Sequence, residues 1–186
     1  ADELSHQWNF YLAGFPNELA EGISTYTNAL FLEEREGRAA YEATIRYCAD
    51  AWLQGADPAS DHAVADPQVY TSPRYRAIVF CKTPVVLDLL RRKLGDERFF
   101  DGFRRAFALN DTAIDGFERL ERGFEEATGE ELRPFFDQWF FRADFPVLEA
   151  SFEMREDEVF VVVTQKQEGA PYTLDVQDGT LGNAWA

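Results

Sequence analysis

Apolar side chains recur at the three- and four-residue spacing of amphipathic helices over most of this chain. This periodicity constrains the fold more than any other feature of the sequence. A glycine or a proline stands near most points where the pattern is interrupted. We therefore expect a mainly α, bundle-like fold, in which the first helix ends near residue 14 and further helices cover 17–36, 38–53, 74–94, 96–107, 111–128 and 130–141.

The helical pattern is interrupted twice within its middle part. Residues 55–73 contain three prolines and several aspartates, which predicts an exposed loop. Pro84 should kink or restart the helix expected at 74–94, because proline has no backbone N–H to donate. We expect the phenylalanines of 96–107 and the aromatic cluster at 135–141 to form core, since both lie at helical spacing.

The period changes after Phe145-Pro146, where polar and apolar residues begin to alternate. Alternation over a short run is typical of a half-buried strand. We expect a short antiparallel β segment with strands near 147–153, 160–164 and 172–176, the second of them more buried than the first. The chain thus divides into a helical part, 1–145, and a β part, 146–186.

The charge balance excludes one large class of partners. The chain has 34 acidic against 18 basic residues and a net charge of −16, whereas nucleic-acid binding requires a basic surface. The composition is strongly acidic and includes only three lysines. It is typical either of a protein adapted to concentrated salt or of a protein with an acidic surface that is encoded by a genome rich in arginine codons. The sequence leaves these two readings open.

No apolar run approaches the roughly 18 residues that a membrane helix needs, and nothing resembles a signal peptide. We therefore expect a soluble protein without a membrane partner, and a cytoplasmic location is slightly favoured. Cys48 and Cys81 are the two cysteines, both in apolar helical contexts. Their spacing predicts no metal site and favours two thiols, although a disulfide stays open.

A possible metal site lies at the start of the chain. Residues at i and i+4 leave the same face of a helix, so Asp2 and His6 can reach one ion, and Glu21 can join them from the second helix. Imidazole and carboxylate groups both bind zinc, and a catalytic zinc takes three protein ligands plus water. Glu3 stands where zinc peptidases carry the glutamate that acts as general base. Asp2, His6 and Glu21 are thus the candidate metal ligands. Glu18, one turn before Glu21, is either a second carboxylate of the site or a helix-capping charge.

These residues belong to a longer series of short motifs, which comprises Asp2-Glu3-Leu4-Ser5-His6-Gln7-Trp8, Glu21-Gly22 with Tyr26, Phe80-Cys81-Lys82-Thr83, Phe135-Phe136-Asp137-Gln138-Trp139 and Phe145-Pro146-Val147-Leu148. In order and rough spacing the series resembles the aminopeptidase N family of gluzincin zinc metallopeptidases. The resemblance implies that 1–145 is the helical half of a thermolysin-like catalytic domain. It also implies that 146–186 is the start of a β-sandwich-like domain or a β appendage.

The resemblance further implies a zinc cofactor and hydrolysis of the N-terminal bond of a peptide substrate. Asp2, however, replaces the first histidine of the family, and Phe80 replaces the tyrosine whose hydroxyl stabilises the oxyanion. Losing one such donor typically costs about 10²–10³ in turnover. Tyr75, five residues upstream, is the candidate replacement. We therefore expect a weakly active or inactive zinc peptidase-like domain.

The alternative is a pseudoenzyme, a scaffold that binds a peptide or a partner protein without chemistry. A third reading is the glycyl aminopeptidase family, whose zinc helix carries an aromatic-asparagine pair like Trp8-Asn9. The later aromatic motifs resemble that family less. The sequence gives no indication of an oligomeric state.

Overall fold

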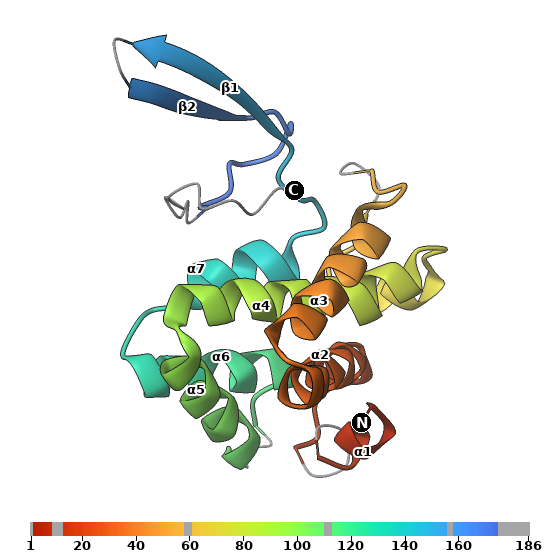
Figure 1. The fold of residues 1–186 in the computed structure, drawn as a ribbon. Helices are drawn as coiled ribbons and strands as arrows, with labels where there is room; N and C mark the ends of the chain where they lie inside the picture. The colour runs from red at the N-terminus through yellow and green to blue at the C-terminus, as the bar shows by residue number, and fades with distance from the viewer. Residues whose placement is uncertain (1, 9–12, 58–60, 110–112, 156–157, 175–186) are drawn as a thin grey trace. The chain divides into compact units, whose positions relative to one another are not determined.

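The structure is a computed structural model that describes residues 2–8, 13–57, 61–109, 113–155 and 158–174, except for the side chains of Asp2, Arg155 and Glu158. Its contacts divide the chain into two units, Ala1–Phe145 and Pro146–Ala186. The first unit is helical and the second contains a two-stranded antiparallel sheet (Figure 1). The expected mainly α fold with a short antiparallel β segment is therefore confirmed.

Helix α2, Asn17–Glu36, packs against α1, Asp2–His6, and against α3, Arg38–Leu53. Its apolar stripe includes Leu19, Ile23 and Tyr26, all fully buried. Gly22 allows a close approach to the next layer, because a Cβ built there would lie 2.3 Å from the Cβ of Thr83. This packing fixes the position of α2, the helix that carries Glu18 and Glu21.

The segment expected to form one helix over 74–94 has two parts. A π-helix, η3, covers Ala77–Lys82, and α4 follows at Thr83–Leu94 with Pro84 in its first turn. Pro84 thus lies just after the change from π- to α-helix, and the backbone stays helical through Lys82 and Thr83. The predicted exposed loop at 55–73 is wrong in part, because it contains the 3₁₀ helix η2, Pro67–Thr71, and because Val64 and Val69 are fully buried.

Helices α5, Asp96–Ala108, and α6, Gly116–Thr128, pack tightly against each other. Helix α6 begins later than predicted because the Asp115 side chain accepts a hydrogen bond from the Glu118 N–H and caps it there; residues 111–112 of the prediction lie outside the described part. The last helical stretch, α7 at Arg133–Phe136 and η4 at Asp137–Phe141, also begins later than predicted. Pro134 fits only the first turn of a helix, which accounts for this shift.

The aromatic stripe of α5 is only partly core. Phe99 is fully buried and packs on Phe124, with the ring centroids 5.2 Å apart. Three other phenylalanines of this helix are half-buried and line an open pocket, so the prediction that the whole stripe is core is wrong. In the cluster at 135–141, Phe136 and Phe140 are fully buried, whereas Phe141 is exposed.

The second unit contains β1, Leu148–Arg155, paired antiparallel with β2, Glu158–Gln165, with Phe152 opposite Val161. This register places apolar side chains on one face, namely Leu148, Ala150, Phe152, Met154, Val159, Val161 and Val163. The expected burial of the second strand is wrong, since Val161 is 56% exposed. Residues 172–174 are not in a strand, and 175–176 of the expected third strand lie outside the described part.

Within the described part of the chain, no helix is long and apolar enough to cross a membrane.

Candidate functional site

Helices α1 and α2 bring His6 and Glu21 together. The His6 Nε2 atom lies 3.3 Å from Glu21 Oε2, and its Nδ1 atom lies 3.3 Å from the Ser24 hydroxyl oxygen. Glu21 and Ser24 are one turn apart on α2, so both can reach the same imidazole ring. The two side chains are about one fifth exposed, at 19% and 21%. The pair is thus held in place and still open to solvent.

A second carboxylate stands one turn earlier on the same helix. The Tyr70 hydroxyl donates a hydrogen bond of 2.6 Å to Glu18 Oε2. Tyr70 belongs to η2, so this contact joins the segment once expected to be an exposed loop to α2. Tyr70 cannot be found from the sequence, because no local pattern relates residues that are 52 positions apart.

Tyr75 lies beside this group of residues. Its ring packs on Tyr70, with the centroids 5.3 Å apart, and meets Phe80 edge-on at 6.0 Å. Burial raises the pKa of the Tyr75 hydroxyl, and the negative charges of Glu21 and Glu18 raise it further, while Arg76 opposes them. Tyr75 therefore keeps its proton and can donate a hydrogen bond in the neighbourhood of both carboxylates.

The other two predicted site residues stand apart from this arrangement. Glu3 is exposed to solvent, and no contact joins it to His6 or Glu21 among the interactions described. Asp2 is in α1, but its side chain lies outside the described part of the structure. The structure therefore brings together His6 and Glu21 of the predicted ligands and places Tyr75 near them.

The donor set can be compared with what zinc requires. A catalytic zinc takes three protein ligands and a water molecule. Among the described residues, no group of three or more His, Cys, Asp or Glu side chains is arranged to hold a metal ion. His6 and Glu21 supply two donors, and the side chain of Asp2, the third candidate ligand, lies outside the described part.

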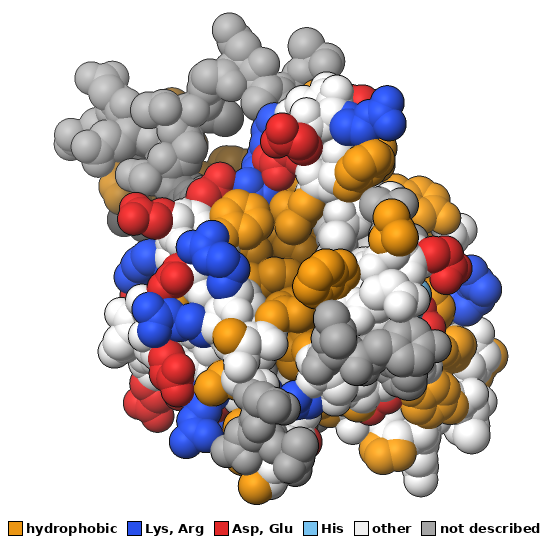
Figure 2. Space-filling model, turned by 90° about the horizontal axis from the view of Figure 1, so that it is seen from below, with side chains coloured by type: hydrophobic (Ala, Val, Ile, Leu, Met, Phe, Trp, Pro, Cys, Tyr) orange, Lys and Arg blue, Asp and Glu red, His pale blue; other side chains and the backbone are white. Residues whose placement is uncertain are grey.

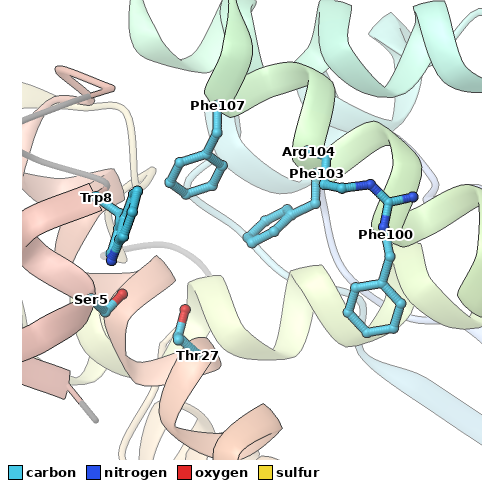
Figure 3. A pocket seen from close by; sticks show the side chains of 7 residues that line it. All are labelled: Ser5, Trp8, Thr27, Phe100, Phe103, Arg104 and Phe107. Atoms are coloured by element: carbon cyan, nitrogen blue, oxygen red, sulfur yellow. The ribbon is translucent and has the colours of Figure 1, made fainter.

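An apolar pocket of about 420 Å³ lies between α1, α2 and α5. Figure 3 shows Phe103 and Phe107 of α5 directed across it toward Trp8 and Thr27, with Arg104 at one side. The full lining consists of Ser5, Trp8, Thr27, Phe100, Phe103, Arg104 and Phe107. On the face seen in Figure 2, hydrophobic side chains gather around a hollow that charged side chains border. Arg104 is exposed and contacts Asp101 at 3.5 Å.

Comparison with known proteins gives one informative match. No protein-family model matches the chain. Over 91 residues, 49% of this chain, the sequence is 32% identical to aminopeptidase N of Lactococcus lactis subsp. lactis. The matched part is 10% of that relative's length, so the chain spans only a small share of it. The chain is therefore, at most, distantly similar to aminopeptidase N over half its length.

Proposed function

We propose that this chain is a degenerate aminopeptidase N-like domain that binds the amino-terminal end of peptides and hydrolyses them weakly or not at all. The observation that carries the proposal is the contact of 3.3 Å between His6 Nε2 and Glu21 Oε2, from two separate helices. These are two of the residues that the motif resemblance assigns to the metal centre. The distant similarity to aminopeptidase N supports the same ancestry.

The charges around this contact favour a cationic ligand group. Glu18 and Glu21 are both half-buried and one turn apart; Glu18 accepts the hydrogen bond of Tyr70, and the charges of both raise the pKa of Tyr75. A partly desolvated carboxylate pair attracts an ammonium group more strongly than a fully hydrated pair does. The free α-amino group of a peptide supplies such a charge, and the Tyr75 hydroxyl can donate a hydrogen bond to the adjacent backbone.

Two features oppose efficient hydrolysis. Asp2 stands where the resemblance implies a histidine ligand, and a catalytic zinc needs three protein ligands. Phe80 has no hydroxyl with which to stabilise an oxyanion. Tyr75 packs edge-on against the Phe80 ring but stands at a different position of the chain from the tyrosine of the family. Absence of one oxyanion donor alone reduces turnover by about 10²–10³.

Calorimetric titration with two short peptides of the same sequence tests the binding proposal, one with a free amino terminus and one acetylated. We expect the free peptide to bind and the acetylated peptide to bind at least about tenfold more weakly, a difference of about 1.4 kcal/mol. Glu21→Gln should remove most of this preference. Glu34→Gln is the matched control, because Glu34 is exposed on the same helix roughly 20 Å farther along its axis. Equal binding of both peptides to the unmodified protein would refute the proposal.

The second candidate function is a binding scaffold that uses the aromatic pocket. The observation that favours it is the pocket itself, whose four aromatic side chains suit an apolar side chain of a partner peptide. Arg104→Glu at the pocket margin should weaken such binding and leave the amino-terminal preference unchanged. Glu21→Gln should do the reverse, so the two variants distinguish the two sites.

Changing the two residues that depart from the family pattern back to the family residues distinguishes a recent loss of activity from an old one. The double variant Asp2→His, Phe80→Tyr replaces both the ligand and the oxyanion donor that the resemblance implies. An enzyme that lost activity recently should regain zinc-dependent hydrolysis in this variant, whereas a long-diverged scaffold should not.

A further inference from the structure

The two cysteines of the chain, 33 positions apart, meet in the folded protein. Cys48 lies on α3 and Cys81 on η3, two elements that pack against each other. Both are free thiols, and they are hydrogen-bonded to each other. Cys48 is 1% exposed, whereas Cys81 is partly open to solvent.

The surroundings make the two thiols unequal. The hydrogen bond from Cys48 lowers the pKa of Cys81, burial opposes it, and the positive charge of Arg76 adds to the lowering. The same contact raises the pKa of Cys48, and burial raises it further. The pKa of Cys81 therefore lies below that of Cys48, and Cys81 is the thiol that loses its proton first. A nucleophilic thiolate next to a second thiol is the arrangement found in redox-reactive cysteine pairs.

We propose that Cys48 and Cys81 form a redox-reactive dithiol, which a peroxide converts into an intramolecular disulfide between α3 and η3. In the first step the Cys81 thiolate attacks one peroxide oxygen, the O–O bond breaks, and a sulfenic acid and hydroxide form. In the second step the Cys48 sulfur attacks the Cys81 sulfur, the S–O bond breaks, and water leaves with the Cys48 proton. Two thiols and one hydrogen peroxide thus yield one disulfide and two water molecules.

The two thiols are already neighbours before oxidation. A disulfide brings two sulfur atoms to about 2.05 Å, and thiols that already share a hydrogen bond are neighbours before oxidation. The new bond would tie α3 covalently to η3, the element that carries Phe80 and follows Tyr75. Oxidation therefore restrains one wall of the proposed peptide site, although the reaction itself does not depend on that proposal.

Intact-mass spectrometry of the folded protein treated with hydrogen peroxide tests the inference. We expect the monomer to lose two hydrogen atoms, and proteolysis without reductant to yield one cross-linked peptide that contains both Cys48 and Cys81. Dithiothreitol should restore the original mass. The oxidised monomer should also melt at a higher temperature than the reduced one, because the bond restricts the unfolded chain.

Two variants separate the steps. In Cys48→Ser, the Cys81 sulfenic acid should persist and be trapped by dimedone. In Cys81→Ser, the buried Cys48 should react with peroxide at least about tenfold more slowly than Cys81 does in the other variant. An oxidised product that is a disulfide-linked dimer, or equal peroxide reactivity of the two single-cysteine variants, would overturn the inference.

Discussion

At the scale of single residues, Lys82 is the most unusual side chain of the helical unit, because its ammonium group is fully buried. Its Nζ atom donates a hydrogen bond of 3.1 Å to the Arg142 carbonyl oxygen and lies 5.4 Å from the centre of the Trp52 ring. Burial lowers the pKa of Lys82 to about 8, although the negative charges of Asp61 and Asp144 oppose this. Its charge is therefore a cost to folding at neutral pH.

We predict that Lys82→Met changes the pH dependence of stability. The pKa of Lys82 is about 8 when folded and 10.5 as an ordinary lysine, so between these values the unfolded chain binds more protons and stability rises with pH. The folded protein should gain up to about 3 kcal/mol relative to Lys82→Met between pH 8 and pH 10.5. Urea denaturation over this range measures the difference. Lys93→Met, at an exposed lysine, is the control, and a Lys82→Met curve parallel to it would contradict the prediction.

The residues of the site differ in how far the sequence could predict them. His6 and Glu21 could be found because helical spacing and adjacent helices limit where their side chains go, and the structure places them 3.3 Å apart. Glu3 belongs to the same motif but is exposed. The motif specifies the residue type at this position and does not specify which other side chains contact it. Tyr70 reaches Glu18 from a distant segment whose 3₁₀ turn left no periodic signal.

At the scale of elements, the contact between α5 and α6 depends on two glycines. A Cβ at Gly123 would lie 2.4 Å from the backbone nitrogen of Ala106, and one at Gly102 would lie 2.3 Å from the Phe124 ring. Backbone atoms cannot rotate away as a side chain can. The two helices can therefore lie this close only because glycine occupies both positions.

Gly123→Ala should force the two helices apart and destabilise the protein by roughly 1–3 kcal/mol, the usual cost of overpacking. Alanine has a higher helix propensity than glycine, which would otherwise favour the variant by up to about 1 kcal/mol. Thermal unfolding followed by circular dichroism measures the outcome. Glu126→Ala, at an exposed site of the same helix, is the control and should have little effect on stability. If Gly123→Ala were as stable as this control, the contact between α5 and α6 would be loose.

The existence of the helices was easier to predict than their ends. Amphipathic periodicity and glycine breaks gave α2 and α3 with little error. The starts of α6 and α7 depend on single residues, the Asp115 cap and Pro134. The apolar periodicity extends to residues before these two positions, so periodicity alone predicts helices that begin too early. The half-buried phenylalanines of α5 show the same limit, because periodicity predicts a face and not what covers that face.

At the scale of the whole molecule, the chain consists of two units of unequal kind. The helical unit, Ala1–Phe145, has an extensive core, with side chains such as Tyr26, Leu87 and Phe136 fully buried. The β unit presents an exposed apolar face on two strands, and an isolated hairpin is only marginally stable in water. The assignment of 1–145 and 146–186 to two family domains stays a prediction.

A protein truncated after Phe145 should keep its helical circular dichroism signal and unfold cooperatively, because its core lies within the remaining residues. A fragment of 146–186 should show little stable structure. Far-ultraviolet circular dichroism with thermal melting tests both fragments. A helical fragment that melts without a cooperative transition would show that the division into two units does not describe independent folding.

The measurement that tests the central claim most directly is the zinc content of the protein after dialysis against excess zinc, combined with hydrolysis of aminoacyl anilides by the same sample. We predict much less than one zinc per chain and a rate of hydrolysis that neither a chelator nor His6→Ala changes. One tightly bound zinc per chain, with hydrolysis that a chelator and His6→Ala both abolish, would contradict it.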